Sequence, residues 1–204
     1  SNLELFATLS HEGFPGHLYQ TIYFLKTSPA DIRTLITSSG YVEGWATYIE
    51  SYGYQYAARD LDDPAATDYT RLIALNRRIN LCLYSLLDIG IHYYGWDETQ
   101  ASRLLQFFGI TDAHVVSEIF QYIVETPANY QKYCWGCLNF LDLKKEWKDT
   151  LGDDFNLKAF HQNLLEIGPV QFPVLQKYMN ERLQKKYKEV PVRTSHFMTV
   201  YNIF

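Results

Sequence analysis

The spacing of apolar residues constrains this chain more than any other feature of its sequence. They recur every three or four positions along almost the whole chain, and the strict alternation typical of β-strands is nearly absent. The pattern therefore predicts an all-α fold. We expect helices near residues 3–26 (interrupted at Pro15-Gly16), 30–38, 41–57, 65–94, 98–108, 112–125, 128–150, 157–167 and 170–188.

Helix start and stop signals support these boundaries. Asp97, with Gln100 three residues later, is a candidate N-cap, and Asn156 is another. Gly109 and Gly152 come where two helical patterns end, a position that glycine often occupies. We therefore expect the helices to begin and end close to these residues.

The size and composition fit a single helical domain over residues 1–204. Of the 204 residues, 47% are hydrophobic, which is enough for a substantial core. Residues 191–204 lack a helical period, so we expect an extended tail there. The three cysteines are an odd number and form no disulfide framework, and we interpret them as buried or incidental thiols.

Charge and hydropathy argue against two classes of partner. The net charge is −5 and the lysines occur only in small clusters, so we expect no nucleic-acid partner. No apolar run reaches the roughly 18 residues of a membrane helix. We therefore expect no membrane span in this sequence.

The segment HEGFPGH at residues 11–17 is similar to the zinc-binding motif HExxH with two residues inserted. In HExxH, two histidines one helical turn apart share a zinc ion, and the glutamate acts on the water that zinc activates. On an unbroken helix His17 would point about 240° away from His11. Pro15 forces a deformation, because its ring would collide with the carbonyl of His11, and Gly16 tolerates it. If about two residues are extruded, His17 returns to the side of His11.

A simpler interpretation is that Phe14-Pro15-Gly16 forms an ordinary turn and that His11 and His17 are unrelated surface residues. A third donor favours the metal site. Glu43 follows His17 by 26 residues, which is far enough for the predicted helix 30–38 to turn the chain back. Two histidines and one carboxylate are a common ligand set for catalytic zinc.

The residues beside these ligands suggest further roles. Glu12, next to the first histidine, is placed to accept a proton from the attacking water. Glu50 is an alternative third ligand, but the small residues Gly44 and Ala46 leave more room for helix approach beside Glu43. We therefore favour Glu43 as the ligand.

Five sequence blocks carry a resemblance to a known family. HEGFPGHLYQ followed by YVEGWATYIE resembles the signature of the bacterial family called domain of unknown function 885. Later blocks resemble the same family in the same order, over nearly the whole chain to about residue 180: DIGIHYYGWDETQA (88–101), PANYQKYCWG (127–136) and FNLKAFHQNLLEIGPV (155–170). Members of this family resemble zinc peptidases and are distantly similar to thimet oligopeptidase, Taq-type carboxypeptidase and dipeptidyl peptidase III.

The resemblance implies a metallopeptidase-like helical domain with a lengthened HExxH helix. It implies that His11, His17 and Glu43 bind Zn²⁺ and that Glu12 is the general base. It also suggests Tyr133 as a catalytic residue that donates to the oxyanion, since related helical peptidases use a tyrosine ahead of a glycine on a late helix.

Other candidate residues lie in the family-like blocks or near them. His92 and His161 are candidates for substrate binding or for supporting the site, and Asp88 could orient His92. Arg78, like its neighbour Arg77, is a candidate for holding the carboxylate of a substrate. All of them could equally be core or solvated helix residues. Where the family has an Arg-Tyr pair, this chain has Gln121-Tyr122.

Together these features predict a zinc-dependent peptidase that hydrolyses peptide substrates. We expect the chain to be the C-terminal part of a longer bacterial protein, whose N-terminal region completes the cleft. Its compartment, cytoplasmic or exported, stays open. The alternatives are a metal-dependent hydrolase of another amide or ester, and a non-catalytic helical scaffold with a degenerate site.

Overall fold

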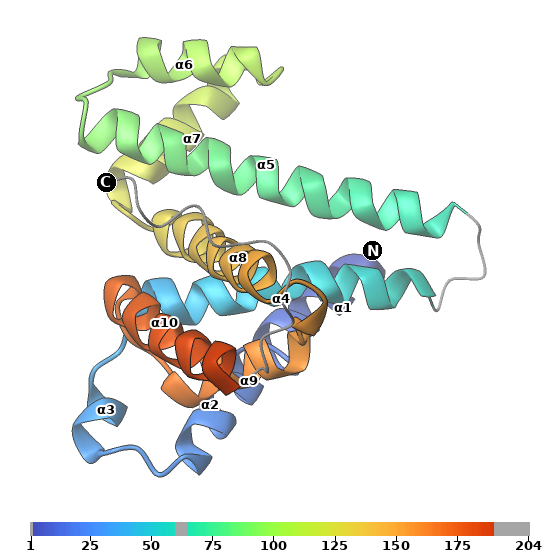
Figure 1. Cartoon of the computed structure of the whole chain (residues 1–204). Coiled ribbons are helices and arrows are strands. Elements are labelled where there is room, and N and C mark those ends of the chain that lie inside the picture. The colour runs from blue at the N-terminus through green and yellow to red at the C-terminus, as the bar shows by residue number, and fades with distance from the viewer. Residues whose placement is uncertain (1, 60–64, 190–204) are drawn as a thin grey trace, which may run out of the picture.

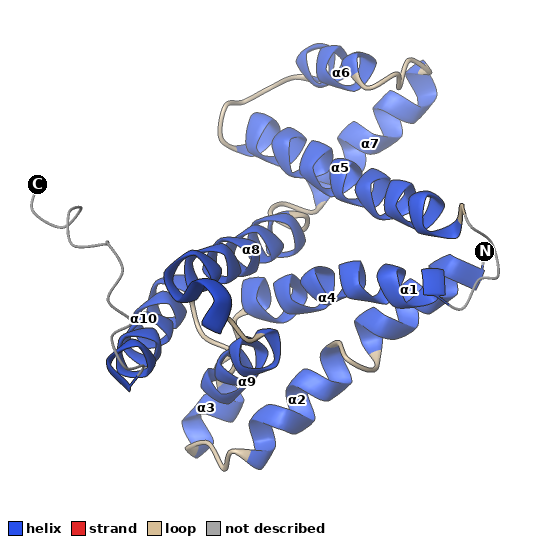
Figure 2. Ribbon diagram, turned by 45° about the vertical axis from the view of Figure 1, so that its right-hand side comes forward, coloured by secondary structure: helices blue, strands red, loops and turns tan. Residues whose placement is uncertain are grey.

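The computed structural model describes residues 2–59 and 65–189, and these residues form helices and no strand (Figures 1 and 2). The prediction of an all-α fold is confirmed. In chain order the helices are α1 (Asn2–Glu12), α2 (His17–Lys26), α3 (Asp31–Leu35), α4 (Ser39–Arg59), α5 (Ala66–His92), α6 (Glu98–Phe107), α7 (Ala113–Glu125), α8 (Gln131–Leu151), the single 3-10 turn η1 (Gly152–Asp154), α9 (Leu157–Ile167) and α10 (Phe172–Glu189).

The expected helix over residues 30–38 is wrong in its length. α3 ends at Leu35, and Ile36 has the extended angles φ −95° and ψ 114°. α3 buries none of its residues. Because most helical stability in proteins comes from packing an apolar face, a short helix without such a face gains little from a further turn. The helix expected from residue 128 also starts later, since Ala128 has a positive φ of 61°.

The helix caps that the sequence indicates are confirmed. The Asp97 side chain accepts a hydrogen bond of 2.9 Å from the Gln100 amide, and the Gln100 side chain accepts one of 3.0 Å from the Asp97 amide. Asn156 Oδ1 accepts one of 2.9 Å from the Ala159 amide. These bonds satisfy backbone donors that a helix start leaves free. The tail expected over 191–204 lies outside the described residues.

The close crossing of α4 and α8 depends on two glycines. A Cβ atom on Gly44 would lie 2.5 Å from the carbonyl carbon of Gly136, and one on Gly136 would lie 2.2 Å from the carbonyl oxygen of Gly40. The two backbones therefore touch, which any larger side chain would prevent. This contact confirms the expected room beside Glu43 and places that residue against the first turns of α8.

Two apolar clusters hold the helices together. The larger one joins α4, α8, α9 and α10 around Trp45, Tyr48, Phe140, Phe160 and Met179, all at most 1% exposed. The smaller one joins α5, α6 and α7 around residues such as Leu83, Leu87, Leu105 and Ile123. In Figure 1 the second group lies above the first, with α5 running between α6 and α4. The segment with HEGFPGH borders the larger cluster through Trp45.

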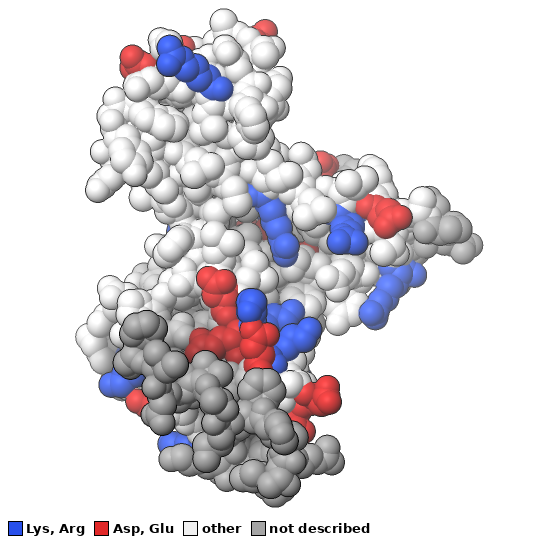
Figure 3. Space-filling view, turned by 45° about the horizontal axis from the view of Figure 1, so that its top comes forward, with Lys and Arg blue, Asp and Glu red and all other residues white. Residues whose placement is uncertain are grey.

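None of the helices in the described part of the chain combines the length and the apolar character that crossing a bilayer requires. On the face drawn in Figure 3, Lys and Arg side chains lie singly or in small groups, some of which border Asp and Glu side chains. That face therefore presents no continuous basic surface.

Candidate metal centre

The HEGFPGH segment ends one helix and starts another. α1 ends at Glu12 and α2 begins at His17, so the motif contains a four-residue connection instead of a continuous helix with a bulge. The Trp45 indole donates a hydrogen bond of 3.1 Å to the carbonyl of Pro15, which ties this connection to α4. A Cβ atom on Gly16 would lie 1.8 Å from the His11 carbonyl oxygen. Glycine is therefore required for the connection to fold back against the end of α1.

This connection brings the two histidines together. The rings of His11 and His17 meet edge to face with centroids 4.7 Å apart. Phe14-Pro15-Gly16 thus lies between two helices, as the simpler interpretation held, but His11 is only 7% exposed and the two histidines are in contact, so they are not unrelated surface residues. The Nε2 atoms of His11 and His17 lie 3.5 Å and 3.3 Å from Oε2 of Glu43 on α4. Three potential ligand atoms therefore converge from three different helices.

The spacing of these atoms fits a metal better than it fits direct hydrogen bonds. Both separations exceed the usual N–H···O distance of about 2.9 Å. Two ligands at about 2.05 Å from a tetrahedral zinc ion would be about 3.3 Å apart. Two imidazole nitrogens and one carboxylate oxygen are a donor set that zinc accepts, whereas calcium and magnesium prefer oxygen alone. His11 and His17 therefore offer two nitrogens that suit zinc, with Glu43 as one possible oxygen donor and Glu12, whose carboxylate lies within 4.8 Å of both histidines, as another.

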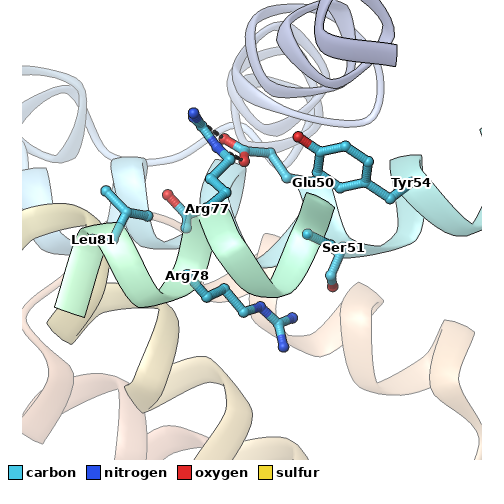
Figure 4. Close-up of a pocket in the computed structure, with 8 residues that line it drawn as sticks. Glu50, Ser51, Tyr54, Arg77, Arg78 and Leu81 are labelled. Atoms are coloured by element: carbon cyan, nitrogen blue, oxygen red, sulfur yellow. Dashed lines mark hydrogen bonds and ion pairs between the residues drawn. The ribbon is translucent and has the colours of Figure 1, made fainter. Parts of the chain in front are cut away.

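Glu50 lies behind the first histidine. Its Oε1 atom is 2.6 Å from Nδ1 of His11, and its side chain is 4% exposed. Arg77 on α5 donates two hydrogen bonds to the same carboxylate. Its Nη2 atom donates to Oε1 at 2.8 Å, and its Nε atom donates to Oε2. Figure 4 shows Arg77 directed toward Glu50, whereas Arg78 points away from it. Glu50 is therefore hydrogen-bonded to His11 and Arg77, whereas Glu43 is the carboxylate that faces Nε2 of both histidines.

The Arg77–Glu50–His11 chain fixes the proton on the His11 ring. Burial alone would raise the pKa of Glu50, but hydrogen bonds from His11 and Arg77 outweigh it and hold that pKa below its usual value. An ionised Glu50 accepts the proton of Nδ1, and Nε2 on the other side of the ring faces Glu43. Burial likewise lowers the pKa of His11, but Glu50 and the nearby charges of Glu12 and Glu43 raise it overall.

Glu12 and Tyr133 lie beside these atoms. Ligand atoms of His11, Glu12 and His17 all fall within 4.8 Å of one another, and Glu12 is exposed to solvent. The Tyr133 ring on α8 lies 6.3 Å from the His11 ring, centroid to centroid. Burial, followed by the charge of Glu43, raises the pKa of Tyr133 above its usual value, so its hydroxyl stays protonated at neutral pH.

Lys132 adds a positive charge that the sequence did not single out. Its Nζ atom is 3.8 Å from Oε1 of Glu43 and 5.0 Å from the centre of the Tyr133 ring. The ammonium therefore faces both the carboxylate ligand and the tyrosine. Its position directly before Tyr133 in the family-like block is the one signal in the sequence that could have pointed to it.

His92 and Asp88 contact backbone groups away from the two histidines of the HEGFPGH segment. His92 Nε2 lies 2.9 Å from the carbonyl of Ile123, and Asp88 Oδ1 accepts a hydrogen bond of 3.1 Å from the Ala128 amide. The two side chains are 3.6 Å apart. His92 therefore contacts α7, Asp88 holds the connection between α7 and α8, and neither is brought to His11, His17 or Glu43.

His161 lies in an aromatic environment on the other side of α4. Its Nε2 atom is 2.8 Å from the Tyr48 hydroxyl, and its ring packs edge to face on Trp45 at 5.4 Å. It borders a pocket of about 320 Å³ between α2, α4 and α9. Burial, aided by the charge of Lys144, lowers the pKa of His161 to about 4, so the ring is neutral near pH 7.

The site also contains contacts that sequence reasoning missed. Glu50 follows Glu43 by seven residues and so shares its face of α4, which is the signal that both carboxylates point the same way. Glu50 is the carboxylate that contacts Nδ1 of His11, and it is held there by Arg77, a residue of another helix. The sequence offered Arg77 and Arg78 together as carboxylate binders, and only Arg77 reaches Glu50.

Residues 1–179 match the family described as bacterial protein of unknown function (DUF885), and the chain belongs to this family. It is similar to a candidate lipoprotein from Colwellia psychrerythraea, with 28% identity over 88% of this chain and a TM-score of 0.69. It is also similar to a candidate lipoprotein of unknown function from Shewanella oneidensis, with 26% identity over 87% of this chain and a TM-score of 0.65. This chain spans about 30% of the first and 31% of the second. No curated protein matches it.

Proposed function

We propose that this member of the family is a zinc-dependent peptidase, in which His11, His17 and Glu43 hold the metal. The observation that carries the proposal is the convergence of two Nε2 atoms on Oε2 of Glu43 at 3.5 Å and 3.3 Å. The ionised Glu50 behind His11 supports it, because ligating histidines usually donate their other ring proton to a carboxylate or carbonyl.

The residues around the ligands suit hydrolysis. Zinc, when bound, would polarise a carbonyl and make water a better nucleophile near neutral pH. Glu12 accepts the proton of the attacking water and passes it to the amine that leaves. Its exposure and its place within 4.8 Å of the two histidines suit this role.

Tyr133 and Lys132 are placed to stabilise the negative charge that develops on the carbonyl oxygen. Tyr133 keeps its proton at neutral pH, because burial and the charge of Glu43 raise its pKa, and it can therefore donate a hydrogen bond. Lys132 adds a positive charge next to its ring. Both residues come from the first turns of α8, which the Gly44 and Gly136 contact holds against α4.

The choice of peptides as substrates rests on the family resemblance and on the residues that would activate water for hydrolysis. Hydrolysis of another amide or an ester would use the same groups, and a helical scaffold with a degenerate site is the non-catalytic alternative.

The proposal is tested on the purified full-length gene product by metal analysis and peptide cleavage. We expect one zinc per chain, cleavage of a mixed peptide library detected by mass spectrometry, and loss of cleavage on chelation with recovery on adding zinc. His17→Ala should abolish both zinc binding and cleavage, and Gln162→Ala on α9 serves as a control. If the protein binds zinc but cleaves only esters, it is a metal-dependent esterase and not a peptidase. A protein without zinc after purification and reloading would contradict it.

A further inference from the structure

Two of the three cysteines meet between α5 and α8. The Sγ atoms of Cys82 and Cys134 lie 3.5 Å apart, although the residues are separated by 52 positions in the chain. Cys134 belongs to the CWGC segment, yet its sulfur contacts Cys82 on another helix. Cys134 and Cys137 are buried free thiols, as expected, whereas Cys82 is exposed and lies against Cys134.

The neighbouring hydrogen bonds fix the register of this pair. The Gln131 side chain donates a hydrogen bond of 2.7 Å to the Ser85 carbonyl, one helical turn from the two cysteines. One turn further, the Ala128 amide donates to Asp88, as described above. From one contact to the next, the residue number on α5 rises by three, from Cys82 to Ser85 to Asp88. The number of its partner on α8 or just before it falls by three. This antiparallel register holds the two sulfur atoms against each other.

The two thiols differ in the way a disulfide-forming pair requires. Cys82 is exposed, so a small molecule can reach it, whereas Cys134 is buried. We propose that Cys82 and Cys134 are a modification site that a small-molecule disulfide such as oxidised glutathione converts to an intramolecular disulfide. This inference does not depend on zinc or on hydrolysis.

The exchange proceeds in two steps. The Cys82 thiolate attacks one sulfur of oxidised glutathione, which forms a mixed disulfide and releases one glutathione thiolate. The deprotonated sulfur of Cys134 then attacks the Cys82 sulfur and releases the second glutathione. Two protein thiols are oxidised, one glutathione disulfide is reduced, and the two thiol protons end on the two glutathiones. Burial, with the hydrogen bond to Cys82, raises the pKa of Cys134 to about 11, so the second step is faster at pH 9 than at pH 7.

The new bond would tie the start of α8 to α5. Tyr133 directly precedes Cys134, and Arg77 lies five residues before Cys82. The crosslink would therefore fix the elements that carry these two side chains relative to each other. Because it closes a long loop of the unfolded chain, it should also raise Tm, by roughly 5–15 °C.

The test is oxidation of the purified protein with oxidised glutathione at pH 8.5, followed by alkylation of remaining thiols and peptide mapping. We expect a monomer that has lost two hydrogen atoms, with Cys82 and Cys134 in one linked peptide and Cys137 alkylated. Cys82→Ser and Cys134→Ser should each abolish the linkage and the rise in Tm. Cys137→Ser, on the same helix as Cys134, should leave both unchanged.

Peptide mapping of the wild-type protein alone can overturn the inference, so it does not rely on the variants folding. A stable mixed disulfide on Cys82, a linkage between Cys134 and Cys137, or dimers joined through Cys82 would each contradict it. The same experiment on zinc-loaded and chelated protein should give the same linkage, which separates this outcome from that of the proposed function.

Discussion

Nδ1 of His11 lies 2.6 Å from Oε1 of Glu50, and this carboxylate is held in turn by Arg77. The contact joins α1 to α4 and, through Arg77, to α5. It leaves Nε2 of His11 facing Glu43, and so determines which side of the ring can act as a ligand.

Glu50→Gln should weaken zinc binding about 10–100-fold while leaving one site per chain. The amide keeps the size of the side chain but loses the charge that holds the proton on Nδ1 of His11. The measurement is competition with a chromophoric chelator at pH 7.5. An exposed substitution, Glu98→Gln, is the control and should leave the affinity unchanged.

A matched pair of arginine variants separates this effect from a general loss of stability. Arg77→Met should weaken zinc binding in the same direction, because Glu50 loses a partner that keeps it ionised. Arg78→Met, one position along α5, should not. Equal zinc affinities for both variants would show that the Arg77–Glu50 pair does not act on the ligand.

Glu12→Gln should keep zinc and lose nearly all turnover. The amide cannot accept the proton of the attacking water, so a contribution of about 10²–10⁴ in kcat disappears. Zinc content by mass spectrometry and single-turnover cleavage are measured on the same sample. Comparable rates at full zinc occupancy would exclude Glu12 as the base.

Tyr133→Phe should lower kcat about 10²–10³-fold with little change in KM or zinc content. The change removes a hydroxyl that acts mainly in the transition state and preserves the ring beside His11. Tyr130→Phe, at the N-terminus of α8, is the matched control and should have no comparable effect on kcat. If the two variants behave alike, Tyr133 is a packing residue.

Gly16→Ala should destabilise the fold by roughly 1–3 kcal/mol and abolish zinc binding. The added methyl group would lie 1.8 Å from the His11 carbonyl oxygen, so the connection between the two histidines must move. Gly40→Ala is the control, since its methyl group would meet only the Phe172 ring at 3.3 Å. Thermal unfolding and zinc titration of both variants check the prediction, which fails if Gly16→Ala retains wild-type affinity.

Acid should destabilise the protein partly through His161. Its pKa is about 4 in the folded protein and about 6.5 in the unfolded chain, so the unfolded state binds more protons between these values. The free energy of unfolding should therefore fall as the pH decreases from about 6.5 to about 4, by roughly 1–3 kcal/mol from this residue, and not further below. Urea unfolding of wild type and His161→Gln across this range is the measurement. An identical slope in the two proteins would contradict it.

Local sequence signals determined the helices and the type of donor atoms. Asp97, Gln100 and Asn156 act on backbone groups within three residues, and Pro15 blocks its own helix, so these effects do not depend on the rest of the fold. The residue types alone likewise indicated two histidines and a carboxylate as possible ligands, because the donor atoms belong to the side chains themselves. The end of α3 was predicted wrongly, because the sequence did not show that this helix buries none of its residues and so gains little from a further turn.

Only the tertiary structure decided how these residues are used. Glu43 and Glu50 lie on one face of α4 and are equivalent by periodicity, and the difference between them arises from Arg77 on α5. The pairing of Cys134 with Cys82 likewise follows from the register of α5 against α8. Such contacts join residues far apart in the chain, and their geometry is set by how closely helix backbones approach, as at Gly44 and Gly136. The sequence indicated that a helix could approach closely at Gly44, but not that the partner would be Gly136 of α8.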